Sequence, residues 1–166
     1  MASKTSHRVA VLALAVAAGL ALISGRSASA QDLEARNTEI VREALKAWGE
    51  GRPGGPYDLL ADDAVWTIAG RSDASRVYAN KADFIDNVIR PFGARMSKGL
   101  TPTVKALYAD GDTVVAHFDA EGVAKDGLPY RNTYAWFLTL KDGRIVRATA
   151  FYDAIAFNEL WRRVTP

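Results

Sequence analysis

Apolar and polar residues alternate through most of the C-terminal half of this chain, and three Asp-Gly pairs interrupt the alternation every 16 residues. The pairs are Asp110-Gly111, Asp126-Gly127 and Asp142-Gly143. Asp-Gly between alternating runs is a strong hairpin signal, because a tight hairpin turn needs positive φ and glycine adopts it without strain. The pattern therefore predicts four consecutive antiparallel strands, at about 102–109, 112–124, 129–140 and 144–153.

Apolar residues follow the helical period in three other segments. These cover about 37–48, about 80–90 and the chain end after residue 153. Asn80 is of the type that caps a helix, and Pro91 is expected to end or kink the second helix because proline lacks a backbone N–H. Between the first two helices we expect a short helix from Pro56 and a first strand over 64–69.

Helices followed by a long antiparallel meander are typical of the α+β class. We expect one domain over residues 37–163, in which a strongly curved antiparallel sheet wraps around the N-terminal helices as a cone. Four aromatic residues are available to line the interior of this cone: Trp48, Trp66, Tyr134 and Trp136. The alternative for each of them is an ordinary core position.

The first 30 residues have the features of a secretory signal that is removed from the mature protein. Lys4 and Arg8 precede an uncharged apolar run over 9–23, and Ala28-Ser29-Ala30 matches the small-residue cleavage pattern. The run is short for a membrane span, and a retained membrane anchor is the alternative. We expect cleavage after Ala30 and export to the periplasm or the cell exterior, which the N-terminal residue of the secreted protein would test.

Composition excludes several classes of function. The leader carries three basic residues and no acidic residue, so its removal changes the formal net charge from +2 to −1. The remaining sequence has no stripe of Lys and Arg, which argues against a nucleic-acid-binding surface. The chain has no Cys, and His117 is its only His beyond the leader, which excludes disulfides and Cys-rich or His-rich metal sites. We expect no cofactor and no metal.

Two segments resemble the nuclear transport factor 2-like (NTF2-like) superfamily. They are Leu59–Trp66, and the hairpin Asp142–Val146 with the Phe151-Tyr152-Asp153 that follows it. The nearest groups are the SnoaL-like polyketide cyclases, the ketosteroid isomerases and the limonene-epoxide hydrolases. The resemblance covers residues 37 to 160 and implies a cystatin-like α+β roll with a pocket inside the bent sheet. It implies no single chemistry, because this fold hosts many activities.

Two of these chemistries can be compared position by position. The three functional residues of the ketosteroid isomerases match Ala44, Ile68 and Trp136 here, and none has the required group. We therefore reject that mechanism. The Tyr and Asn that hold the attacking water in the limonene-epoxide hydrolases match Trp66 and Ile68, which cannot position a water in the same way.

The Asp-Arg-Asp group of the limonene-epoxide hydrolases matches His117, Asp119 and Asp153, so both carboxylates are kept. A SnoaL-like cyclase needs only a carboxylate in an apolar cavity, which Asp119 with His117 would supply. The resemblance thus implies a catalytic group with Asp119 as base, Asp153 as acid and His117 as orienter or proton shuttle. In a dry pocket, the pKa of one carboxylate should rise. Asp153 has a second possible role as the cap of the terminal helix.

His117, Asp119 and Glu121 alternate with apolar residues and therefore share one face of their strand. By alternation alone this would be the solvent-exposed face of a half-buried strand. The resemblance implies instead that it faces the pocket. The residues expected to line the pocket are Trp66, Glu121, Asn132, Tyr134 and Trp136.

These observations leave three classes of function. The first is cofactor-free acid–base chemistry, such as isomerisation, cyclisation, hydration or hydrolysis, on a small hydrophobic substrate. The second is non-catalytic binding of a small hydrophobic molecule. The third is an interaction module that forms a homodimer through the outer face of the sheet, at Thr133, Ala135, Phe137 and Thr139. We expect no nucleic acid as partner and, after cleavage, no membrane.

Overall fold

The computed structural model describes residues 29–166. The predicted leader lies outside these residues except for its last two positions, so its cleavage and the export of the protein stay predictions. The chain divides into two units, Met1–Leu33 and Glu34–Pro166, and the second contains the fold that carries the site. Within residues 29–166, no helix combines the length and the apolar character needed to cross a membrane.

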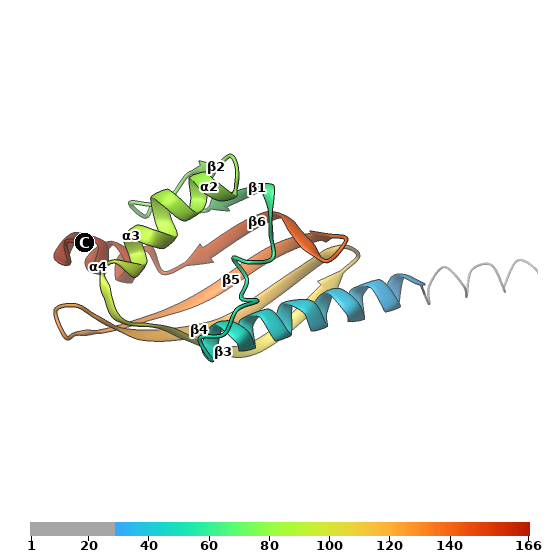
Figure 1. Ribbon diagram of the computed structural model, residues 1–166, viewed down its shortest axis with the longest axis horizontal. Coiled ribbons are helices and arrows are strands. Elements are labelled where there is room, and N and C mark those ends of the chain that lie inside the picture. Colours follow the sequence, from blue (N-terminus) through green and yellow to red (C-terminus); the bar gives the residue numbers. More distant parts are fainter. Residues whose placement is uncertain (1–28) are drawn as a thin grey trace, which may run out of the picture. The chain divides into compact units, whose positions relative to one another are not determined.

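A curved six-stranded sheet forms the body of the second unit (Figure 1). Its strands are β1 (Leu60–Ile68), β2 (Val77–Tyr78), β3 (Met96–Asp110), β4 (Thr113–Ala124), β5 (Pro129–Lys141) and β6 (Arg144–Tyr152). The spatial order is β2-β1-β6-β5-β4-β3, and neighbours are antiparallel except for β1 and β6. The predicted α+β class and the meander are confirmed. Gly111, Gly127 and Gly143 all have positive φ at the hairpin turns.

Strand β3 begins at Met96, earlier than the predicted residue 102. The first half of β3 pairs with β4 irregularly, because the register between the two strands shifts several times. There β3 passes so close to β4 that a Cβ on Gly122 would lie 2.7 Å from the carbonyl oxygen of Lys98 and 2.9 Å from that of Gly99. Glycine at position 122 therefore permits this close approach.

The N-terminal helix covers 29–49 in the described part of the chain, so it begins before the predicted residue 37. From Glu34 onward it belongs to the second unit. Its predicted stripe is confirmed, since Val41, Ala44 and Leu45 are buried and Trp48 is partly buried. The short helix predicted from Pro56 is wrong. Residues 56–59 form turns, and β1 already begins at Leu60.

The second helical segment consists of α2 (Lys81–Phe84), the π-helical η1 (Ile85–Ile89) and α3 (Arg90–Gly93). Asn80 caps it as predicted, with its side-chain oxygen accepting the N–H of Asp83 at 2.9 Å. Pro91 does not end the segment. The segment continues through Pro91 to Gly93, and Pro91 lies where the π-helical η1 changes to the α-helical α3.

The terminal helix α4 (Ala154–Arg163) is confirmed. The carboxylate of Asp153 accepts the N–H of Ile155 at 2.8 Å and of Ala156 at 3.4 Å. Asp153 is therefore an N-cap, the alternative role that the sequence left open for it.

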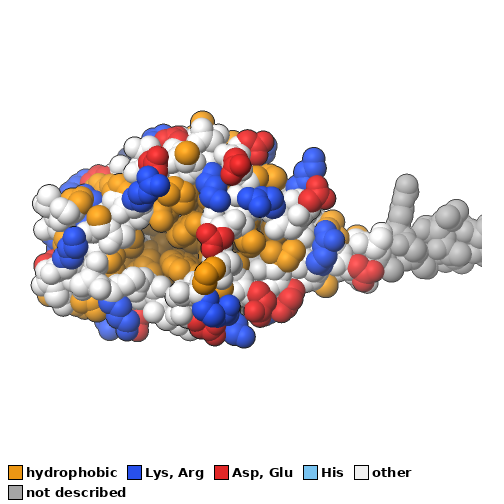
Figure 2. Space-filling view, in the orientation of Figure 1, with side chains coloured by type: hydrophobic (Ala, Val, Ile, Leu, Met, Phe, Trp, Pro, Cys, Tyr) orange, Lys and Arg blue, Asp and Glu red, His pale blue; other side chains and the backbone are white. Residues whose placement is uncertain are grey.

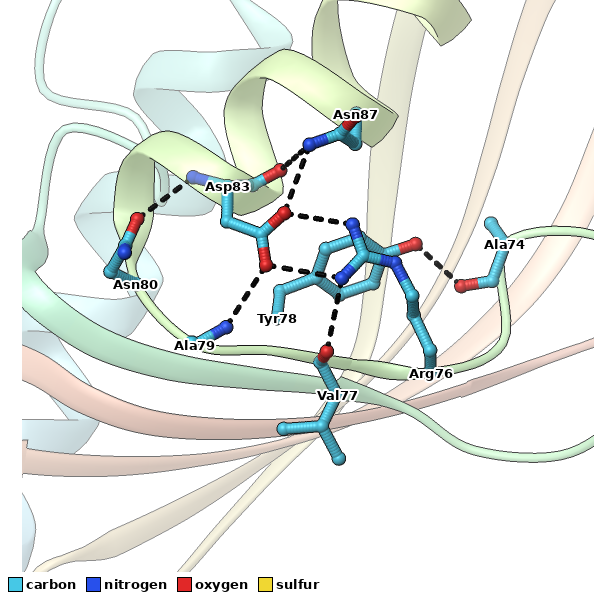
Figure 3. Close-up of polar contacts among 8 residues, drawn as sticks. All are labelled: Ala74, Arg76, Val77, Tyr78, Ala79, Asn80, Asp83 and Asn87. Carbon is cyan, nitrogen blue, oxygen red and sulfur yellow. Dashed lines mark hydrogen bonds and ion pairs between the residues drawn. The ribbon is translucent and has the colours of Figure 1, made fainter.

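A polar network holds the start of α2 in place (Figure 3). The Arg76 guanidinium donates to both carboxylate oxygens of Asp83, at 2.7 and 3.1 Å, and lies 3.8 Å from the ring centre of Tyr78. The hydrogen bonds from Arg76 lower the pKa of Asp83. Because Phe84 follows Asp83, this network also positions the Phe84 ring, which stacks on Trp66.

Candidate ligand-binding site

The register between β4 and β5 decides which side chains face the helices. Direct partners across a strand pair share a face, and Phe118 lies opposite Tyr134 while Asp119 lies opposite Thr133. Phe118 and Tyr134 are buried, whereas the Asp119 side chain is 43% exposed. The inner face of β4 therefore carries the apolar set to which Phe118 belongs.

The orientation expected for His117, Asp119 and Glu121 is corrected by this register. All three side chains lie on the outer face of the sheet, whereas Tyr134 and Trp136 lie on the inner face. The prediction that His117, Asp119 and Glu121 share one face is confirmed, but the choice of face was wrong. Side chains alternate along a strand with period two, so an alignment that is shifted by one residue moves all three to the other face. The proposed catalytic group is thus not assembled inside the sheet.

Polar residues of the outer face form ion pairs and hydrogen bonds with one another and remain exposed to solvent. Asp119 forms an ion pair with Lys105 at 2.7 Å and accepts the Thr133 hydroxyl at 2.7 Å. Lys105 and Thr133 lower the pKa of Asp119, which is opposite to the rise expected for a carboxylate in a dry pocket. Asp119, Glu121 and Asp153 border one open depression, and His117 is not part of its wall.

The inner face of the sheet carries a different site, an aromatic cavity of about 50 Å³. Figure 2 shows a hollow with hydrophobic side chains at its floor, below the segment α2–α3. The residues that line the cavity are Trp48, Tyr57, Trp66, Ile68, Phe84, Val88, Ile89, Phe92, Leu100, Tyr134, Trp136, Ala150 and Tyr152. None of them carries a charge. The volume is far below the roughly 300 Å³ at which ligand pockets begin, so the hollow is largely filled by its own side chains.

Aromatic rings from four elements meet in this wall. Trp66 of β1 stacks on Phe84 of α2, with ring centres 4.3 Å apart, and meets Trp136 of β5 edge-on at 5.2 Å. Trp136 in turn stacks with Trp48 at the end of the N-terminal helix, at 5.8 Å. The rings therefore join both helical segments to the inner face of the sheet.

The polar groups of the wall are the hydroxyls of its three tyrosines and the indole N–H groups of its three tryptophans. Burial raises the pKa of Tyr57, Tyr134 and Tyr152, so all three stay protonated at neutral pH. The hydroxyl of Tyr152 lies 2.8 Å from that of Ser72. The buried Nε1 of Trp66 has no hydrogen-bond partner among residues 29–166. The wall thus offers hydrogen-bond donors and no ionised group.

Of the residues expected in the pocket, Trp66, Tyr134 and Trp136 line this cavity. Asn132 faces inward but lies behind the wall, and Glu121 lies on the outer face. Tyr57 and Tyr152 were missed. Tyr152 lies opposite Tyr134 on the neighbouring strand, a register that the strand lengths could have indicated. Tyr57 lies in an irregular segment, and no periodic signal marks it.

Known proteins resemble this chain over most of the second unit. The family model of the SnoaL-like domain matches residues 41–148. The uncharacterized protein YesE of Bacillus subtilis (strain 168) is 37% identical over 125 residues, which cover 72% of this chain and 78% of YesE.

Solved structures agree on the fold. Bal32a, from a soil-derived mobile gene cassette, has a TM-score of 0.66 at 19% identity and covers 78% of this chain and 99% of its own. An NTF2-like protein of Burkholderia thailandensis E264 has a TM-score of 0.63 at 22% identity, with coverage of 76% and 97%. TerC, co-crystallised with polyporic acid, has a TM-score of 0.61 at 18% identity, with coverage of 75% and 97%. Because the family model matches more than half of the chain, the chain belongs to the SnoaL-like family of the NTF2-like superfamily.

Proposed function

We propose that this protein binds, in the aromatic cavity and without a cofactor, a small apolar molecule that carries a hydrogen-bond-accepting oxygen. The SnoaL-like family to which the chain belongs suggests a cofactor-free pocket protein of the isomerase or cyclase type. The observation that carries the proposal is the composition of the cavity wall, which combines aromatic rings with hydroxyl and indole donors and has no charged side chain. Such a wall favours an apolar ligand and orients it through its oxygen.

The donor groups favour polarisation of a ligand carbonyl. A tyrosine hydroxyl aimed at a carbonyl oxygen stabilises negative charge that develops there, and the effect is strongest in a site without water. The wall contains no carboxylate or imidazole to remove a proton. We therefore favour binding with polarisation of the oxygen over the carboxylate-based proton transfer expected from the sequence.

Ligand entry requires the cavity to widen, since 50 Å³ holds only a few water-sized groups. Trp48 and Tyr57 are partly buried members of the wall, and they lie on either side of a loop over 50–55. Gly51 and Gly54 have positive φ in this loop. We propose that Trp48 and Tyr57 move apart on binding, because a loop rich in glycine opposes such a movement least.

Acetophenone, a single ring with one carbonyl, is a suitable first probe, and polyporic acid is a second because TerC was crystallised with it. We expect saturable shifts of the indole N–H signals of Trp48, Trp66 and Trp136 in ¹H–¹⁵N NMR spectra. Trp161 lies outside the cavity wall and serves as the internal control.

A variant that fills the cavity gives the matched control. Ala150 is 2% exposed and lines the cavity, so Ala150→Val adds two methyl groups to the wall and should weaken binding about tenfold. Absence of saturable shifts in the wild type with both probes would refute the proposal. Unchanged affinity in Ala150→Val would place the binding site elsewhere.

We also propose that the outer face of the sheet pairs with a second copy of the chain. Phe137 and Phe151 are 42% and 47% exposed there, with ring centres 5.8 Å apart, and Tyr108 is 63% exposed. Four charged side chains on this face form two ion pairs, Lys105 with Asp119 and Arg131 with Glu121, while Arg147 of β6 is exposed there without one among the described residues. An apolar patch beside paired charges can meet its own copy across a two-fold axis with little repulsion.

Light scattering coupled to size-exclusion chromatography tests this proposal. We expect twice the single-chain mass for the wild type at tens of micromolar, and the single-chain mass for Phe137→Asp. Leu128→Asp is the control, because Leu128 is 52% exposed next to the β4–β5 turn, away from the patch. A single-chain mass for the wild type would contradict pairing.

A further inference from the structure

We infer that Asn132 and Tyr130, which lie behind the cavity wall, position the Tyr134 hydroxyl so that it donates its proton to an oxygen of the bound ligand. The inference rests on the proposed function, since Tyr134 lines the same cavity. Asn132 and Tyr130 do not line it and are only 6% and 3% exposed. They act on the ligand through Tyr134 and are therefore positioning residues.

The amide of Asn132 has a fixed orientation. Its oxygen accepts the backbone N–H of Asp153 at 2.9 Å, and its nitrogen donates to the backbone carbonyl of Asp153 at 3.0 Å. A backbone N–H can only donate and a carbonyl can only accept, so the two contacts together identify which end of the amide is the nitrogen. The remaining N–H of Asn132 then points at the Tyr130 hydroxyl, at 2.9 Å.

This orientation determines the direction of the next hydrogen bond. The Tyr130 oxygen accepts from Asn132, so the proton of Tyr130 needs an acceptor of its own. The Tyr134 hydroxyl lies 3.2 Å away and is its other partner among residues 29–166. In either direction one of the two hydroxyl protons has no acceptor among these residues, which is unfavourable for a buried group. Tyr134 lines the cavity, where a ligand or water can accept its proton, and Tyr130 does not, so Tyr130 donates to Tyr134.

Tyr134 is thereby left with a proton that no group among residues 29–166 accepts. Its ring is 6% exposed and stacks on Phe118 with centres 5.0 Å apart, which keeps the hydroxyl at the cavity wall. A ligand with an acceptor oxygen, such as a ketone or quinone, completes this chain of hydrogen bonds. An apolar ligand of the same shape leaves the proton without a partner.

The test compares acetophenone with α-methylstyrene, in which a methylidene group replaces the carbonyl oxygen. The measured quantity is the ratio of their dissociation constants, determined by the indole NMR titration. We expect Tyr134→Phe to reduce the preference for the ketone about 3–10-fold, the effect of one neutral hydrogen bond. Tyr130→Phe should reduce it about 2–4-fold and leave the affinity for α-methylstyrene within about twofold, because Tyr134 loses its orientation but not its proton.

Tyr78→Phe is the matched control. Tyr78 is also buried, at 2%, but its hydroxyl donates to the carbonyl of Ala74 at 2.7 Å and lies outside the cavity wall. We expect no change in the ratio for this variant, whereas a purely structural effect of losing a buried hydroxyl would move both probes alike. Equal ratios in the wild type and Tyr130→Phe would overturn the inference while the cavity still binds. If neither probe binds the wild type, the proposed function itself fails, and the inference with it.

Discussion

A Trp66→Ala variant is expected to lose about 3–5 kcal/mol of unfolding free energy, the range for removing a buried tryptophan. Trp66 is 1% exposed, stacks on Phe84 and meets Trp136 edge-on. Removing its ring takes away contacts to α2 and β5 together, and it leaves a void beside the existing cavity. Urea denaturation followed by far-UV circular dichroism at pH 7 measures the loss.

Trp66→Phe separates packing from the indole N–H. Phenylalanine keeps a ring to stack on Phe84 and removes the Nε1 that has no partner among the described residues. An unpartnered buried donor is itself unfavourable, so we expect this variant to cost only about 1 kcal/mol. Equal losses for the two variants would show that ring packing does not hold Trp66 in the wall.

Gly122→Ala is expected to lower the unfolding free energy by about 2–3 kcal/mol, the upper part of the range for overpacking. The new Cβ would lie within 3 Å of two backbone oxygens, those of Lys98 and Gly99, and of the end of the Met96 side chain. Backbone atoms cannot turn aside as a side chain can, so the first half of β3 must move. Leu100 follows directly and lines the cavity, so we also expect weaker ligand binding.

Gly99→Ala is the control on the same irregular part of β3. A Cβ there would meet no atom within 4 Å, and its backbone does not have positive φ. We expect a change within about 0.5 kcal/mol by the same denaturation measurement. If the two variants lose the same unfolding free energy, β3 does not approach β4 as closely at Gly122 as the structure shows.

The meander could be predicted because its signals are local. Each Asp-Gly pair supplies its own turn, and the alternation between turns covers only a few residues. The start of β3 could not be predicted in this way. Its residues pair with β4 through shifted register, and Gly99 lacks the side chain that would continue an alternating pattern. Gly122, which permits this approach, lies in the next strand.

The position of the site shows a different limit. Alternation in β4 separates Phe118 and its apolar neighbours from His117, Asp119 and Glu121, and hydrophobicity alone puts the apolar set inside. The residue-by-residue comparison with the limonene-epoxide hydrolases indicated the opposite face. That comparison depended on an alignment through the hairpin turns. An error of one residue in such an alignment assigns every side chain of a strand to the wrong face.

The amino-acid sequence alone therefore determined the α+β class, the four meander strands, the Asn80 cap and the SnoaL-like resemblance, because these depend on residues close together in the chain. Only the tertiary structure decided between the face that hydrophobicity indicated and the face that the resemblance implied, and it placed tyrosine hydroxyls on the enclosed side of the sheet. That outcome depends on which face the helices cover. Contacts between distant segments settle it, such as Trp48 with Trp136 and Phe84 with Trp66.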